Sequence, residues 1–358
     1  MKQLSFLAII FYSLSSFTQN ETASNPLQVS GYLETYFAYD FANPENHTRP
    51  SFLYSYNRHN EVALNLGLIK LSYQKQNLRS NIALMAGSYP NSNLAAEPGV
   101  LKNIYEANIG FKLSESKNVW IDAGVFSSHI GFESAIGKDC WNLTRSILAE
   151  NSPYYESGVK VSYTTKNEKL FVSGLILNGW QRMQRVNGNN TPAVGHQITF
   201  KPTDKITLNS SSFVGNDAPD SVRVMRYFHN FYGIFQLKEK IGFTIGFDCG
   251  AQQVAKNDNN FNTWYSPVII LKVAPTKKIS LAARGELYQD KNGVIISTGT
   301  PNGFQTVGYS LNVDYNIQNN LVLRIEGRGF SSEDAIFINE ESPVNDNFFV
   351  ISSLAFSF

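Results

Sequence analysis

Cysteine and excess charge are both scarce in this sequence. Thirty Lys and Arg residues against 29 Asp and Glu residues give a net charge of +1. This balance argues against an electrostatic nucleic-acid binder, because such proteins concentrate basic residues to neutralise phosphates. The only cysteines are Cys140 and Cys249, so the chain has no disulfide framework. They could pair in an oxidising compartment, but two isolated buried thiols are the preferred interpretation.

Long apolar runs are missing as well, except at the start of the chain. Lys2, an apolar run over residues 4–17 and small polar residues ending at Thr18 predict a secretory signal peptide over residues 1–18, which is removed. Beyond it, no run approaches the roughly 18 apolar residues that a membrane helix requires. If the mature chain, residues 19–358, spans a membrane, it must do so as a closed barrel, because only closure satisfies every backbone amide in lipid.

What the sequence does contain is typical of strands. Aromatic residues make up 13% of the 358 residues, with 25 Phe and 18 Tyr, and these residues favour strands together with Val, Ile and Thr. In residues 27–41, Leu27, Val29 and Leu33 occupy one parity while Gln28 and Glu34 occupy the other. Strict alternation of this kind predicts a strand with one apolar face.

The same alternation recurs along the chain and predicts about sixteen strands, an even number of segments long enough to cross a bilayer. Fourteen is the alternative count, because the segments near His196 and Ile206 are weak. In residues 61–73, Val62, Leu64 and Leu66 share the apolar parity with Leu68. The fold class predicted is all-β, a single antiparallel transmembrane β-barrel.

The connections between these segments fall into two sets that alternate along the chain. Short polar turns such as QKQN, SESKN and IQNN follow one end of each pair, and long varied segments such as residues 43–57, 130–153 and 331–346 follow the other. Short periplasmic turns and long extracellular loops are typical of outer-membrane barrels. We expect short helical segments in the long loops. A soluble propeller would repeat a blade at a fixed period, and no such repeat is found.

Long strings of the sequence carry a resemblance to a known family. They include SGYLETYFAYDF from Ser30, AAEPGVLKNIYEAN from Ala95, and SSHIGFESAIGKDCWNLTRSILAENSPYYESG from Ser127. These strings resemble the OmpL-like β-barrel porin family of Bacteroidota-type outer membranes, and the matching stretches cover most of the mature chain. The resemblance implies a barrel in the outer membrane of a Gram-negative cell, surrounded by outer-membrane lipid, with a presumed pore.

The chain ends in an amphipathic strand, NFFVISSLAFSF, whose last residue is aromatic. Such an ending resembles the signal that the barrel assembly machinery reads during biogenesis, with Phe356 and Phe358 as the candidate residues. We expect the more apolar parity, which includes Phe348, Leu354 and Phe358, to face lipid. Pairing of this strand with residues 27–41 would then close the cylinder.

If the apolar parity faces lipid, the other parity lines the lumen. A basic side chain at mid-bilayer would cost about 2 to 4 kcal/mol on the lipid face, so a polar interior explains the charges on that parity. A barrel of porin size is expected to hold a water-filled channel, since only small barrels fill with side chains; pairing across the wall of a plugged barrel is the alternative. The candidate lumen-facing charges are Glu34, Asp40, Glu106, Asp122, Glu156, Glu286, Asp314 and Glu326 against Arg79, Lys112, Lys160, Arg284, Arg324 and Arg328.

Residues 131–152 abandon the period of two. Leu143, Ile147 and Leu148 fit one face of a short helix. We hypothesise that this segment, with residues 92–103, folds inward and constricts the channel, where its charges would set selectivity. The alternative is an extracellular cap on the rim. The candidate constriction residues are Glu97, Lys102, Glu133, Lys138, Asp139, Arg145 and Glu150.

Signals of catalysis are weak. The five histidines are dispersed, with no pair at metal-ligand spacing. Ser127 and Ser128 beside His129 suggest a hydroxyl and a base, but adjacent residues on a strand point to opposite faces. We therefore expect no enzyme, no cofactor and no metal site.

The function predicted from the sequence is a porin for passive diffusion of small polar solutes. The alternatives are a substrate-specific channel, a structural or adhesive barrel whose loops bind a partner, and a hydrolytic barrel. Trimers are common among sixteen-stranded porins, so a homotrimer is an open alternative to a monomer.

Overall fold

Sixteen long strands of the chain pair in one closed antiparallel sheet. The computed structural model describes residues 25–358, so the expected signal peptide, residues 1–18, lies outside the described residues. Neighbours around the barrel follow the order β1-β18-β15-β14-β13-β12-β11-β10-β9-β8-β7-β6-β5-β4-β3-β2. The predicted fold class and the count of sixteen are confirmed, and the two weak segments near His196 and Ile206 are β8 and β9.

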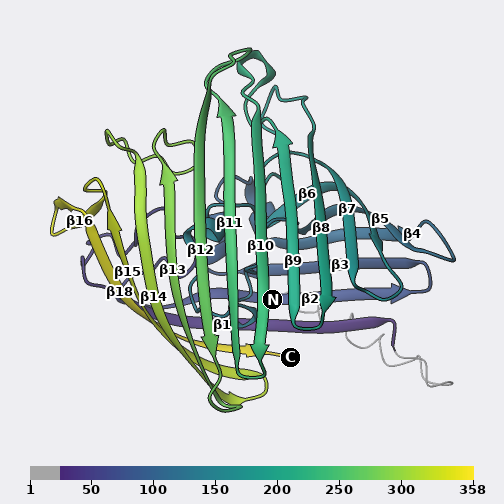
Figure 1. Cartoon of the computed structure of the whole chain (residues 1–358), viewed down its shortest axis with the longest axis horizontal. Helices are drawn as coiled ribbons and strands as arrows, with labels where there is room; N and C mark the ends of the chain where they lie inside the picture. Colours follow the sequence, from purple (N-terminus) through teal and green to yellow (C-terminus); the bar gives the residue numbers. More distant parts are fainter. Residues whose placement is uncertain (1–24) are drawn as a thin grey trace, which may run out of the picture.

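The strands of the barrel have the following bounds: β1 (Leu27–Asp40), β2 (Val62–Lys75), β3 (Leu78–Ala86), β4 (Ile104–Lys112), β5 (Asn118–Ser127), β6 (Tyr155–Thr164), β7 (Leu170–Leu177), β8 (Ala193–Thr203), β9 (Ile206–Gly215), β10 (Arg226–Lys238), β11 (Ile241–Gln253), β12 (Phe261–Val273), β13 (Ile279–Asp290), β14 (Phe304–Gln318), β15 (Leu321–Ser332) and β18 (Asp346–Ser357). In Figure 1, β9 to β12 of the near wall run across β1 to β3 of the far wall. Strands of a closed barrel must tilt relative to its axis, so opposite walls cross in this way.

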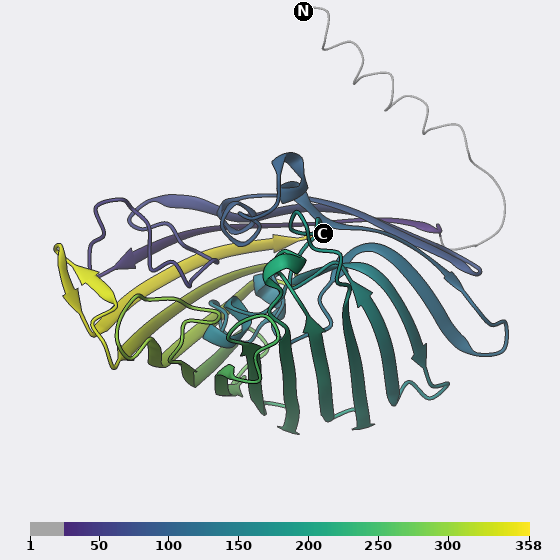
Figure 2. The same ribbon diagram turned by 90° about the horizontal axis from the view of Figure 1, so that it is seen from above.

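The two ends of the chain close the cylinder, as expected. β1 pairs with β18 in antiparallel register, with Tyr32 opposite Ser357. The pairing extends to the last residue, because Gly31 N donates to Phe358 O at 3.0 Å and Phe358 N donates to Gly31 O at 3.1 Å. Figure 2 shows β1 (purple) and β18 (yellow) side by side. The rings of Phe356 and Phe358 lie 6.0 Å apart on the outer face.

The faces of β1 and β18 follow the predicted parity, but part of β2 does not. Leu33 is 48% exposed and Leu354 is 42% exposed on the outside, whereas Glu34 is fully buried on the inside. In β2, Leu66 and Leu68 are buried inward, so the expectation that they share the lipid face with Val62 was wrong. A bulge shifts the register of β2 against β1 between Glu34 and Thr35, and an extra residue in one strand flips every side chain beyond it.

Eight long loops alternate with seven short turns along the chain, as predicted. Short helical segments occur in the long loops, also as predicted: α2 (Ser88–Asn93), η2 (Gly99–Asn103), η3 (Gly137–Asp139), α3 (Ile147–Glu150) and η4 (Asp220–Val222). The last loop adds a hairpin of β16 (Phe337–Asn339) and β17 (Ser342–Val344). Leu143 lies before α3, so the expected helical face of Leu143, Ile147 and Leu148 was wrong for Leu143, although all three are buried. Within residues 25–358, no helix has the length and apolar character needed to cross a membrane.

The largest apolar core of the protein lies inside the barrel, between long loops and the wall. Phe52 and Tyr56 of the first long loop pack with Leu143, Ile147 and wall residues such as Phe330. Burial of a large apolar side chain contributes roughly 1.5 to 3 kcal/mol, so this core stabilises the position of the loops inside the barrel.

The two cysteines lie in different environments. Cys140 is buried within a loop while Cys249 is half-buried on β11, and both are free thiols. Two isolated thiols were expected; burial holds for Cys140 only.

Candidate pore and its constriction

The loop between β5 and β6, residues 128–154, crosses the lumen and contacts the opposite wall. We call it the inner loop. Leu143 N donates to Asn312 Oδ1 of β14 at 3.1 Å, and Ile147 N donates to Glu286 Oε2 of β13 at 2.6 Å. Figure 2 shows this loop (blue-teal) between the two walls. The segment that abandons the strand period therefore folds inward and does not cap the rim.

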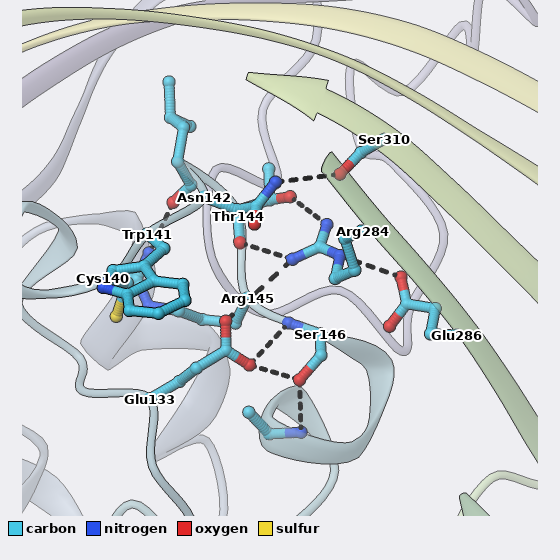
Figure 3. A network of polar contacts seen from close by, with 12 residues as sticks. Glu133, Cys140, Trp141, Asn142, Thr144, Arg145, Ser146, Arg284, Glu286 and Ser310 are labelled. Atoms are coloured by element: carbon cyan, nitrogen blue, oxygen red, sulfur yellow. Dashed lines mark hydrogen bonds and ion pairs between the residues drawn. The ribbon is translucent and has the colours of Figure 1, made fainter. Parts of the chain in front are cut away.

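Side chains of β13, β14 and β15 hold the inner loop by its backbone. Arg284 Nη1 donates to Thr144 O at 2.7 Å, Arg328 Nη1 donates to Arg145 O at 2.7 Å, and Arg324 Nη1 donates to Gly137 O at 2.5 Å (Figure 3 shows the first contact). A loop that crosses the lumen exchanges water for protein contacts, so its backbone groups need protein partners. The guanidinium group suits this role because it has five N–H donors in a fixed fork.

The same wall residues pair with one another. We call this group the wall network: Arg284, Glu286, Asp314, Arg324, Glu326 and Arg328. Arg284 Nη2 lies 3.0 Å from Glu326 Oε1, and Arg324 Nε lies 2.7 Å from Asp314 Oδ1. Arg328 Nη2 lies 2.5 Å from Glu286 Oε1. These six residues were expected to line a water-filled channel. They do face the interior, but all are buried, because the inner loop occupies the space where water was expected.

Arg145 ties the inner loop to the first strand. Its guanidinium is fully buried and donates to Ser134 O at 2.6 Å and to Tyr56 Oη at 3.2 Å. Tyr56 Oη in turn donates to the Glu34 carboxylate at 2.9 Å. The chain Arg145, Tyr56, Glu34 therefore joins the inner loop, the first long loop and β1.

Two buried carboxylates of the inner loop have perturbed acidities. Glu133 accepts a hydrogen bond from Ser146 N at 3.0 Å, and Glu150 accepts one from Tyr54 N at 3.0 Å. Burial raises the pKa of both side chains above the ordinary 4.5, although Arg284 opposes the rise at Glu133 and Arg145 opposes it at Glu150. A carboxyl whose pKa is raised by docking favours the docked loop when protonated. That contribution is fully present below the ordinary pKa and is lost as the pH rises through the raised value.

The remaining constriction candidates lie in different places. Lys138 and Asp139 are exposed and form an ion pair at 3.0 Å. Glu97 is buried and accepts hydrogen bonds from Tyr155 Oη at 3.1 Å and Met183 N at 2.8 Å, so it joins two long loops. Lys102 is half-buried at the end of η2.

Three of the expected lining acids lie buried near the long loops. Besides Glu34, Asp40 accepts a hydrogen bond from Asn347 Nδ2 at 2.8 Å and lies 3.9 Å from Arg49 Nε. Glu156 is fully buried, and neither of its oxygens has a hydrogen-bond partner among residues 25–358. Glu34 and Asp40 therefore connect the long loops to the barrel wall, whereas Glu156 is buried without such a contact.

Beside β2 to β7 the lumen is open. A cavity of about 900 Å³ is lined there by polar residues that include Arg79, Lys112, Asp122 and Lys160. An adjoining cavity of about 440 Å³ shares Glu106 with it and reaches the inner loop at Lys138. These cavities bring together the lining candidates that are not covered by the inner loop.

Ion pairs order the charges in the open part. Arg79 Nε donates to Asp122 Oδ1 at 2.7 Å, and Lys70 Nζ lies 2.5 Å from Glu106 Oε2. Lys70 was not among the sequence-based candidates, because it shares its parity with Leu66 and Leu68, which were assigned to the lipid face. The presence of Lys70 among these apolar residues was the sequence signal that the inward and outward faces of β2 exchange along the strand.

The residues considered for hydrolysis do not form a catalytic pair. Ser127 Oγ donates to Glu106 Oε1 at 3.0 Å, whereas His129 Nε2 lies 2.8 Å from the carbonyl oxygen of Ser212. In the described part of the chain, no three His, Cys, Asp or Glu side chains gather in a way that could hold a metal ion.

Several solved structures have a similar fold. OmpT of Vibrio cholerae is 9% identical, with a TM-score of 0.60 over 95% of this chain and 100% of that chain. The anion-selective porin from Comamonas acidovorans is 8% identical, with a TM-score of 0.61 over 93% of this chain and 99% of that chain. The outer membrane channel DcaP of Acinetobacter baumannii is 9% identical, with a TM-score of 0.59 over 95% of this chain and 99% of that chain.

At the level of sequence, a search of the curated proteins finds no match. A family model does match, and its description is "Putative beta-barrel porin-2, OmpL-like". The match covers residues 26–358, which is almost all of the described chain, and the protein belongs to this family of outer-membrane β-barrel porins.

Proposed function

We propose that the protein lets small polar solutes diffuse passively across the outer membrane, through the part of the lumen that the inner loop leaves open. The observation that carries this proposal is the pair of adjoining polar cavities beside β2 to β7, of about 900 Å³ and 440 Å³. Porin-sized barrels hold aqueous channels, and charged side chains that line such a channel set what passes. Arg79, Glu106, Asp122 and Lys160 are the lining residues in this proposal.

The inner loop acts as the constriction in this proposal. It is attached to the wall by the arginines of the wall network and to the first long loop by Arg145 and Glu150. A loop with so many buried contacts is a fixed partition, so solutes would pass beside it and not through it. This arrangement supports passive diffusion over the alternatives of an adhesive or hydrolytic barrel.

Liposome swelling tests the proposal. The refolded mature protein in liposomes should admit small sugars and amino acids, at rates that fall as solute size increases. Saturable uptake of one solute would instead support a substrate-specific channel, and the lack of any permeation would refute both.

A deletion variant tests the constriction separately. Removal of residues 135–147 should raise the single-channel conductance and relax the size limit, because it removes the part of the inner loop that contacts the wall network. Deletion of residues 256–259, in the loop between β11 and β12, is the control and should leave both unchanged. Equal conductance of the two variants would contradict the role given to the inner loop.

Two further parts of the proposal concern the mature protein. We expect removal of residues 1–18, which N-terminal sequencing of protein from outer membranes would test. A homotrimer is the assembly to test first, since OmpT of Vibrio cholerae, which is similar in fold, is described in a trimer form. Light scattering of the detergent-solubilised protein measures the assembly size.

A further inference from the structure

The open part of the lumen carries more positive than negative charge. The two cavities are lined by Lys70, Arg79, Lys112, Lys138 and Lys160 and by Glu106, Asp122 and Asp139. Five bases against three acids give +2, whereas the whole chain of 358 residues carries only +1. From this charge distribution we infer that the channel is selective for small anions, an inference that rests on the proposed porin function.

The wall network in the covered part of the lumen does not offset this charge. The wall network holds three arginines against three carboxylates, so its net charge is zero. Its members are also buried beneath the inner loop. The wall network therefore adds no net charge to that of the cavities beside β2 to β7.

Two lysines account for the excess. Lys70 pairs with Glu106, Arg79 pairs with Asp122, and Lys138 pairs with Asp139. Among residues 25–358, no ion pair within 4.0 Å involves Lys112 or Lys160. Each of these two lysines is half-buried and lines the larger cavity, with no carboxylate oxygen of the described residues within 4.0 Å of its ammonium group.

The strand register places these charges in rows across the wall. Arg79 lies opposite Gly110, Gly110 opposite Asp122, and Asp122 opposite Lys160. Gly110 leaves room for the Asp122 carboxylate, because a Cβ at this position would collide with it. Arg79 therefore pairs with Asp122 across β4, and Lys160 is left at the end of the row.

Lys112 stands nearer the periplasmic end of the same face. It is two residues beyond Gly110, about 7 Å along the strand at roughly 3.4 Å per residue. Lys160 Nζ lies 4.6 Å from the centre of the Phe126 ring, in a cation–π contact. An anion that moves along this wall would leave one unpaired lysine as it approaches the next.

Lys112 and Lys160 also lie two strands apart around the wall, so they act on different parts of the cavity. The Debye length is about 8 Å at physiological ionic strength, so an ion in the cavity interacts with each lysine before salt screens it. The low-dielectric wall of a barrel also focuses the field of charges on one side of a cleft. We expect chloride and small carboxylates to permeate faster than cations of similar size.

Reversal potentials in planar bilayers test this inference. With the full mature protein under a potassium chloride gradient, the chloride-to-potassium permeability ratio should exceed one. The variant Lys112→Glu/Lys160→Glu changes the net charge of the cavities by four, from +2 to −2, and should lower the ratio below one. The control Lys277→Glu/Lys278→Glu makes an equal change at two exposed residues in the turn between β12 and β13 and should keep the wild-type ratio.

The outcomes separate the two levels of the argument. A wild-type protein without conductance would refute the porin function itself. Conductance with a ratio of one or less would refute anion selectivity alone, and a ratio that the Lys112→Glu/Lys160→Glu variant leaves unchanged would refute the assignment to these lysines. If that variant fails to fold, as judged by heat-modifiable mobility on gels, Lys112→Gln/Lys160→Gln should bring the ratio close to one.

Discussion

Replacement of Arg324 with methionine should release the inner loop from the wall. The Arg324 side chain is 1% exposed. It donates to Asp314 at 2.7 Å and to the carbonyl oxygens of Gly137 at 2.5 Å and Cys140 at 3.0 Å. Arg324 also donates to Trp141 O at 3.3 Å. Methionine has a similar length but no donor, so the substitution removes the arginine partner of a carboxylate and of three loop carbonyls.

The size of the effect follows from the loss of one member of a buried ion pair. Such a loss costs about 3 to 5 kcal/mol. The lower end applies here, because the Asp314 side chain is 12% exposed and keeps a hydrogen bond from Asn312 Nδ2 at 2.9 Å. A cost of about 3 kcal/mol corresponds to an increase of roughly 100-fold in the undocked fraction of the inner loop.

Limited proteolysis measures this fraction. Trypsin can cut the inner loop after Arg145, which is fully buried in the docked state, so cleavage there requires undocking. The cleavage rate of Arg324→Met in the folded barrel should exceed that of the wild type by about 100-fold. Single-channel recordings of the same variant should show brief events of higher conductance.

Two variants serve as controls. Arg223→Met changes an arginine in the loop between β9 and β10, away from the inner loop, and should cleave at the wild-type rate. Asp314→Asn in combination with Arg324→Met removes the unpaired carboxylate and should recover part of the protection. Cleavage of Arg324→Met within about threefold of the wild type, with unchanged currents, would refute the reasoning about the wall network.

Three further predictions concern assembly, pH and the thiols. Deletion of Phe358 or the substitution Phe358→Asp should lower outer-membrane levels but leave the selectivity of the remaining channels unchanged, because the residue closes the β1–β18 seam; normal levels on immunoblots would contradict this. Protection of Arg145 against trypsin, measured relative to an unfolded reference peptide at each pH, should fall as the pH rises above 4.5, the ordinary pKa of the buried Glu133 and Glu150. The variant Glu133→Gln/Glu150→Gln should flatten this profile; an equally steep profile would count against the assignment. Gel mobility should be the same with and without reductant, since Cys140 and Cys249 are both free; a faster-migrating oxidised monomer would show that they pair.

The barrel was predictable from the sequence because its signal is local. Lipid on one side and protein or water on the other impose a period of two on each strand, which is visible in Leu33 and Glu34 without any knowledge of neighbours. The faces of β1 and β18 followed from it directly. The inward face of Leu66, Leu68 and Lys70 did not, because it depends on a bulge in the pairing of β2 with β1, and register belongs to two strands at once.

The roles of the lumen charges were less predictable. The loss of alternation in residues 131–152 indicated an inward loop, but not the wall that it meets. Arg324 and Arg79 have the same local pattern in the sequence. Arg324 is 1% exposed and packs against the inner loop, whereas Arg79 lines a cavity. The difference depends on the path of the inner loop, which lies more than 150 residues before Arg324 in the sequence.

That path gives the two walls of the lumen different functions. The inner loop leaves the barrel wall between β5 and β6 and reaches the opposite wall. Its carbonyl oxygens need hydrogen-bond donors there, and the arginines of β13 and β15 supply them. Charges on the far wall are therefore neutralised by one another and hold the inner loop, while charges on β2 to β6 line the cavities. In the proposed channel, selectivity depends on the few residues beside β2 to β7, so Lys112 and Lys160 should govern permeation and the wall network should govern whether the constriction is present at all.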